Sequence, residues 1–140
     1  GGTATLMSYR IDGSALTRAP LPDALRAAAA RLRDAMGEET LAWLGALPLS
    51  WQSGTLWAVH AGADPYREMT AQSARVLLYG HPEFDSAPRG DGLWIAHGHV
   101  EAALPSAGDG RIALDTAAWS TGRLTACAVR PDGRFDFLQT

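Results

Sequence analysis

The sequence contains no lysine, no asparagine and only one cysteine, Cys127. A single cysteine cannot build a disulfide framework, which suits a reducing compartment, so we expect a cytoplasmic protein. The lack of asparagine excludes any site that needs an asparagine side chain. All 12 basic residues are arginine, and this bias, together with the many alanines and glycines, indicates a GC-rich bacterial genome.

Long apolar runs and a strong net charge are missing as well. No uninterrupted apolar run approaches the roughly 20 residues of a membrane-spanning helix, and no signal peptide is visible. The net charge of −3 provides no strong field for nucleic acid or an anionic membrane, so we expect neither as a partner. The chain opens Gly1-Gly2-Thr3 without a methionine, which suggests a trimmed tag or a sequence cut from a longer protein.

The 140 residues are an ordinary globular mixture, 46% apolar and 19% charged, sufficient for one domain. Apolar spacing predicts a helix that is capped by Asp23 and ended by Gly37. Further helices are predicted over residues 38–47 and 70–78. The five tryptophans are expected mostly in the core, not as a stacking platform for nucleotides; they are Trp43, Trp51, Trp57, Trp94 and Trp119.

Apolar segments bounded by turn residues predict the strands of a mixed fold. These segments are residues 49–51, 55–59, 93–96, 123–129 and 135–138. The first two form a hairpin, and the last two form a C-terminal β-hairpin around Pro131-Asp132-Gly133. Residues 80–92 and 107–110 are predicted loops. The expected fold class is α/β (α+β), with a mixed sheet and flanking helices.

Two of these strands continue into histidine and glycine in the same way. Leu56-Trp57-Ala58-Val59-His60-Ala61-Gly62 and Leu93-Trp94-Ile95-Ala96-His97-Gly98-His99 each join a buried strand to these residues. Open α/β sheets bind ligands beyond the carboxyl ends of their strands, and imidazole is the commonest metal-binding side chain. A hydrogen-bonded structural histidine is the alternative at each position. The spacing fits no zinc finger and no His-Glu-x-x-His motif.

Four groups of residues, which together cover nearly the whole chain, carry recognisable motifs. They are Gly1-Gly2-Thr3-Ala4-Thr5-Leu6-Met7-Ser8-Tyr9, His60-Ala61-Gly62-Ala63-Asp64-Pro65, His97-Gly98-His99-Val100, and Arg111-Ile112-Ala113-Leu114-Asp115-Thr116-Ala117-Ala118 with Gly122-Arg123-Leu124-Thr125-Ala126. In this order they resemble motifs of the bacterial serine/threonine (phosphoprotein) phosphatases, a branch of the calcineurin-like metallophosphoesterase family. The family motifs read Gly-Gly-x-x-Thr-Leu-x-Ser-Tyr-Gly, His-Ala-Gly-Ile-x-Pro, His-Gly-His-Thr and Arg-Ile-x-Ile-Asp-Thr-Gly-Ala…Gly-x-Leu-Thr-Ala.

The resemblance implies half of a calcineurin-like αββα sandwich, with residues 1–140 as the C-terminal portion of a single metallophosphoesterase domain. It implies a hydrolase with two divalent metal ions, in which His60 and His99 bind the same ion. Manganese is the first candidate, and iron or zinc are alternatives. The implied substrate is a phosphoester, either a phosphoprotein or a dinucleoside polyphosphate.

His81 falls where relatives carry the arginine that grips the substrate phosphate. The resemblance therefore makes His81 a catalytic candidate, although a solvated loop histidine is the alternative. Histidine would fill the role weakly, because arginine offers a permanent charge and a bidentate fork.

Three motifs of the family are absent: Gly-Asp-x-His-Gly, Gly-Asp-x-Val-Asp-Arg-Gly and Gly-Asn-His-Glu. Because they supply the metal-binding carboxylates, we expect the 140-residue chain by itself to be inactive and to self-associate. A first alternative is a non-catalytic fragment or binding module that keeps the phosphatase scaffold. A second is a different metal hydrolase that uses Asp64 and Glu101 as ligands.

Overall fold

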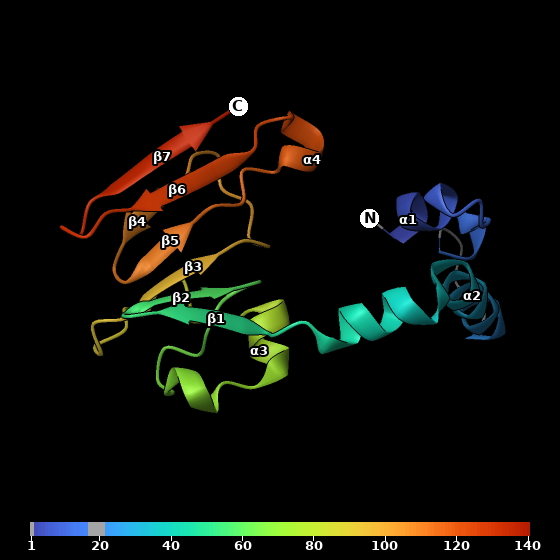
Figure 1. Ribbon diagram of the computed structural model, residues 1–140, viewed down its shortest axis with the longest axis horizontal. Coiled ribbons are helices and arrows are strands. Elements are labelled where there is room, and N and C mark those ends of the chain that lie inside the picture. The colour runs from blue at the N-terminus through green and yellow to red at the C-terminus, as the bar shows by residue number, and fades with distance from the viewer. Residues whose placement is uncertain (1, 17–21) are drawn as a thin grey trace. The chain divides into compact units, whose positions relative to one another are not determined.

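The computed structural model describes residues 2–16 and 22–140, and contacts divide the chain into two compact units, residues 1–47 and 48–140 (Figure 1). Within the described ranges, no helix has both the length and the apolarity that a bilayer crossing requires. The assignment of residues 1–140 to a portion of one metallophosphoesterase domain stays a prediction.

The first unit is helical. It contains α1 (Gly2–Ser8), the 3-10 helix η1 (Gly13–Leu16) and α2 (Pro22–Ala46). Ala28 and Leu32, which belong to one apolar stripe of α2, pack against Leu6 and Ile11. This small cluster is the hydrophobic core of the unit.

The break predicted at Gly37 is present. Gly37 has φ 78° and ψ 157°, which interrupts α2 and divides it into two helical segments. The prediction that Asp23 caps this helix is wrong, because α2 begins at Pro22 and Asp23 lies inside its first turn. Asp23 pairs there with Arg26 at 2.6 Å. Proline is well placed in a first turn, where its missing N–H costs no helical hydrogen bond.

The second unit is built on a five-stranded mixed sheet. Its strands are β1 (Ser50–Ser53), β2 (Leu56–Val59), β3 (Trp94–His97), β4 (Ser106–Gly108) and β5 (Arg111–Ala113). The spatial order is β1-β2-β3-β5-β4. The three central strands, β2, β3 and β5, are parallel, and the two edge strands pair with them in antiparallel fashion. The three parallel strands therefore end at the same edge of the sheet.

The two faces of this sheet are covered differently. On one face, Ile95 packs with Leu77 of α3 (Ala74–Tyr79) and with Phe84. On the other face, the ring of Trp94 contacts that of Phe135 in a tilted arrangement, with 4.5 Å between ring centres. Phe135 begins β7 (Phe135–Gln139), which pairs with β6 (Thr125–Val129) as the predicted C-terminal hairpin. Figure 1 shows α3 and the hairpin on opposite sides of the sheet, and the mixed α+β class is confirmed.

Three local predictions need correction. The segment predicted as a loop over residues 107–110 contains most of edge strand β4, and the turn at Asp109 and Gly110 takes positive φ values. The predicted helix over 70–78 is divided into η2 (Met69–Ala71) and α3, whose first turn is capped by Ser73. A short helix, α4 (Ala118–Thr121), follows β5 where no helix was predicted.

Candidate functional site

His60 and His99 lie side by side at the carboxyl ends of β2 and β3. These strands are parallel neighbours, and the amide of Gly98 donates to the carbonyl of His60 at 2.9 Å. The ring centres of the two histidines are 5.0 Å apart and the planes are tilted by 53°. Both residues are exposed to solvent. The structure thus brings together the two histidines that the sequence placed in one site, whereas metal binding by them stays a prediction.

Asp115 follows the third parallel strand, β5, and contacts the segment that carries His99. Its Oδ2 accepts a hydrogen bond from the amide of His99 at 3.0 Å, and its Oδ1 accepts one from the amide of Ala117 at 2.9 Å. The carbonyl of Asp115 accepts from the amide of Ala102 at 2.8 Å. One residue therefore connects the segment after β3 to the segment after β5.

Two glycines allow the chain to pass close to the site. A β-carbon at Gly62 would lie 2.8 Å from Cδ1 of Phe84, which is closer than real contacts of this kind. Phe84 is buried and is fixed by an edge-on contact with His97 at 4.8 Å. At Gly98 a β-carbon would lie 3.6 Å from the carbonyl oxygen of His60, which is ordinary contact. Gly62 is therefore required by packing, and Gly98 is not.

His97 belongs to the core and not to the exposed pair. Its side chain is buried against Phe84, and its Nδ1 lies 3.3 Å from the carbonyl oxygen of Gly98. Burial lowers the pKa of His97, because the charged ring would lose its hydration. These contacts favour the structural role that was the alternative for a strand-end histidine.

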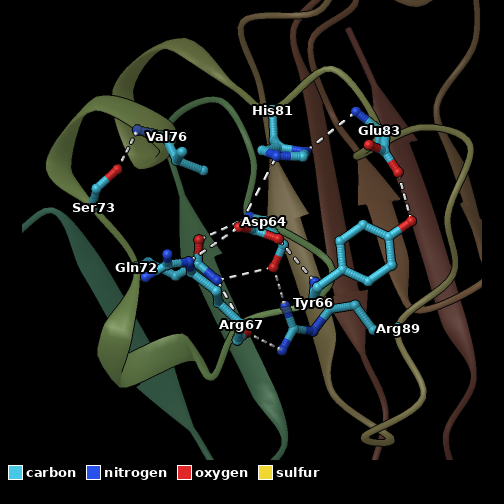
Figure 2. A network of polar contacts seen from close by, with 9 residues as sticks. All are labelled: Asp64, Tyr66, Arg67, Gln72, Ser73, Val76, His81, Glu83 and Arg89. Carbon is cyan, nitrogen blue, oxygen red and sulfur yellow. Dashed lines mark hydrogen bonds and ion pairs between the residues drawn. The ribbon is translucent and has the colours of Figure 1, made fainter.

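The segment after His60 is held by a polar network centred on Asp64 (Figure 2). Gln72 Nε2 donates to the carbonyls of Asp64 and Arg67 at 3.0 and 3.1 Å. Arg89 donates to the same two carbonyls at 2.9 and 3.0 Å, and its guanidinium also pairs with Asp91. Because Arg89 is buried, its charge needs these partners. The segment that follows His60 is therefore held by hydrogen bonds from two side chains, Gln72 and Arg89.

His81 is part of this network. Its Nδ1 accepts a hydrogen bond from the amide of Glu83 at 3.2 Å, and its Nε2 lies 4.0 Å from Oδ2 of Asp64. Nε2 points toward Asp64 in Figure 2. Arg67 shares the same carboxylate oxygen at 3.3 Å. His81 is therefore a loop histidine with fixed neighbours, and its predicted contact with substrate phosphate stays a prediction.

The geometry of the exposed pair can be compared with that of a metal site. A metal–nitrogen bond of about 2.1 Å puts each ring centre roughly 3.2 Å from the metal. Two imidazoles bound at about 90–109° then have centres roughly 4.5–5.2 Å apart. The observed 5.0 Å between His60 and His99 fits this range. The distance between the ring centres is therefore compatible with both rings binding one cation, and binding itself stays a prediction.

A complete set of ligands is not found in the part of the chain that the structure describes. No group of three or more histidine, cysteine, aspartate or glutamate side chains gathers there as a metal site would require. Glu101, an alternative ligand, accepts a hydrogen bond from Nε1 of Trp119 at 2.8 Å. Asp64, the other alternative, pairs with Arg67 and His81. Among the described residues, His60 and His99 are therefore a pair without a third such side chain gathered beside them.

A hollow of about 340 Å³ adjoins the site on the hairpin face of the sheet. Gly98 and Asp115, which adjoin the histidine pair, also line this hollow, and its walls are mostly apolar. The size is within the usual range of small-molecule pockets, about 300–1,000 Å³. Its other lining residues are Ala58, Val59, Ala96, His97, Leu114, Thr116, Ala118, Leu124 and Thr125.

No model of a known protein family, no curated protein and no solved structure matches this chain. The resemblance to metallophosphoesterases therefore stays a prediction from the sequence motifs.

Proposed function

We propose that residues 48–140 form the histidine-bearing half of a metal-dependent phosphoesterase site, of the kind found in serine/threonine protein phosphatases. The observation that carries the proposal is the pair of exposed imidazoles, 5.0 Å apart, at the carboxyl ends of two parallel strands. This is the edge of a sheet where α/β proteins bind ligands. The finer fold proposed with it is half of an αββα sandwich.

In this proposal His60 and His99 hold one divalent cation, with manganese as the first candidate and iron or zinc as alternatives. A cation there would neutralise negative charge on the phosphoryl oxygens of a phosphoprotein or a dinucleoside polyphosphate. His81 contacts the substrate phosphate in this proposal, for which its Nε2 would turn away from Asp64. The hollow beside Gly98 offers space for an apolar part of the substrate.

A second candidate is a non-catalytic fragment or binding module that keeps this scaffold without the metal. The observation that favours it is the lack of a third metal ligand among residues 2–16 and 22–140. Metal affinity separates the two candidates, because the module binds no cation at His60 and His99.

The test is a calorimetric titration of the 140-residue chain with Mn²⁺ and Zn²⁺, repeated on single variants. We expect weak binding of one ion, and a loss of affinity of at least about tenfold in His60→Ala and in His99→Ala. His81→Asn should bind like the unchanged chain, because its ring is engaged in the Asp64 network. No binding by the unchanged chain, or equal binding by His99→Ala, would favour the non-catalytic module.

A further inference from the structure

His99 is the central residue of a tight turn and has a left-handed backbone conformation. The amide of Val100 donates to the carbonyl of Gly98 at 2.7 Å, which closes a three-residue turn around His99. His99 has φ 65°, in the left-handed region that residues with a β-carbon rarely adopt. A three-residue turn with positive φ at its centre is the rare, strained form. The position of the His99 ring thus depends on a backbone conformation that needs support.

The support comes from one carboxylate. Asp115 accepts the amide of His99 on Oδ2 at 3.0 Å and the amide of Ala117 on Oδ1 at 2.9 Å. Ala117 is also left-handed, with φ 54°. Both oxygens of Asp115 are therefore bonded to amides of residues that are held in a disfavoured conformation. A carboxylate is well suited to this role, because its hydrogen bonds to amides are stronger than those of a neutral acceptor.

We infer that Asp115 is a positioning residue, which holds the His99 turn so that the ring of His99 stays beside that of His60. The inference rests on the proposed function in one respect: the pair is taken to bind a divalent cation. Both carboxylate oxygens of Asp115 are already bonded to backbone amides. Asp115 acts on the site through the backbone of His99, and it fixes the start of α4 through Ala117.

The neighbouring residue, Thr116, supplies a matched control. Thr116 is more buried than Asp115 and donates from Oγ1 to the carbonyl of Arg123 at 2.9 Å. It also shares a hydrogen bond with the hydroxyl of Thr125 at 2.7 Å. These bonds fix the hairpin and not the His99 turn. Loss of Thr116 contacts should therefore lower stability without changing the histidine pair.

The experiment compares Asp115→Asn, Asp115→Glu and Thr116→Val in the 140-residue chain. Three quantities are measured on each: the thermal midpoint, the affinity for Mn²⁺, and the nuclear Overhauser effect between the two imidazole rings without metal. We expect both Asp115 variants to lose the ring-to-ring signal and to bind Mn²⁺ at least about tenfold more weakly. Thr116→Val should lower the thermal midpoint and keep the ring-to-ring signal and the Mn²⁺ affinity.

The glutamate variant separates position from charge. Asp115→Glu keeps the negative charge but moves the oxygens by one methylene. If Asp115→Glu kept the Mn²⁺ affinity that Asp115→Asn loses, the charge of the carboxylate and not its position would be what matters, and the inference would be overturned. Equal losses of signal in Thr116→Val and the Asp115 variants would also overturn it, since that result describes general destabilisation. If the unchanged chain binds no Mn²⁺, the proposed function fails. The ring-to-ring signal then still decides the role of Asp115.

Discussion

Backbone hydrogen bonds bring His60 and His99 together, and the glycines around them experience very different surroundings. Gly62 is enclosed by the ring of Phe84, with Ala61 and Ala63 completely buried on either side. Gly98 has ordinary space around it. At the scale of single residues, the packing behind the site is therefore more restrictive than the site itself.

The glycine pair gives a direct stability prediction. Gly62→Ala should lower the free energy of unfolding by about 1–3 kcal/mol, because the new methyl group overlaps a buried ring that is fixed by His97. Gly98→Ala should leave it unchanged or raise it by up to about 1 kcal/mol, because alanine restricts the unfolded chain. Urea denaturation followed by circular dichroism measures both. Equal effects at the two positions would contradict the packing described for Gly62.

Cys127 provides a prediction about pH. Burial raises the pKa of its thiol above the ordinary value of 9.0, and the nearby carboxylate of Asp136 acts in the same direction. A raised thiol pKa means that the folded chain keeps the proton, so this group's contribution to stability is lost as pH rises above about 9. The rate of alkylation by iodoacetamide should therefore rise at higher pH in the folded chain than in urea. Coincident pH profiles would contradict the burial of Cys127.

Some residue-level features could be predicted from the sequence and others could not. The proximity of His60 and His99 follows from two apolar runs that end in histidine, because parallel neighbours end at one edge of a sheet. The role of Arg89 could not be predicted, since an arginine in a polar loop is usually solvated. The expectation of mostly buried tryptophans is wrong for Trp43, Trp51 and Trp119, which are 61%, 58% and 82% exposed.

At the scale of elements, the segment between β2 and η2 is held by two side chains with overlapping roles. Gln72 and Arg89 donate to the same carbonyls, those of Asp64 and Arg67. Each carbonyl oxygen has two lone pairs, and the two donors occupy both. Removal of one donor leaves the other in place, so the two side chains should be coupled energetically.

A double-mutant cycle measures this coupling. Arg89→Met and Gln72→Ala together should destabilise the chain by about 0.5–2 kcal/mol more than the sum of the single changes. Arg130→Met is the matched control, since it removes an arginine from an exposed pair with Asp136 and should cost less than about 1 kcal/mol. Unfolding in urea gives all the values. Additive losses would show that the two side chains act independently.

The predicted elements succeeded where hydrophobic pattern was strong. The apolar runs gave β2 and β3, and the turn residues at positions 131–133 gave the β6–β7 hairpin. Edge strand β4 was missed because Ser106-Ala107-Gly108 has no alternation of apolar side chains; its place depends on pairing with β5. Short α4 was missed for a similar reason, since it depends on the turn that Asp115 holds.

At the scale of the whole molecule, we predict a chain that self-associates and does not turn over substrate. Two-metal hydrolysis needs carboxylates that bridge and hold the cations, and the described residues gather no such group. Large apolar side chains are exposed in the second unit, and edge strands β1 and β4 each pair on one side only within it. Among these side chains are Trp51, Leu104, Trp119, Leu124 and Leu138.

Two measurements check this prediction on the purified chain. A p-nitrophenyl phosphate assay with Mn²⁺ should show no turnover above buffer, and multi-angle light scattering should show species larger than a monomer. Steady turnover by a monodisperse monomer, abolished in His99→Ala, would contradict both expectations. Such a result would mean that residues 48–140 contain more of the site than the histidine pair.

Anomalous diffraction can locate a cation bound by His60 and His99 together at the two rings themselves. Crystals of the 140-residue chain would be soaked in Mn²⁺ or Zn²⁺ and measured on both sides of the absorption edge of the metal. We expect one anomalous peak within about 2.1 Å of a ring nitrogen of His60 and of His99. A peak bonded to only one of these rings, or to neither, would contradict this expectation.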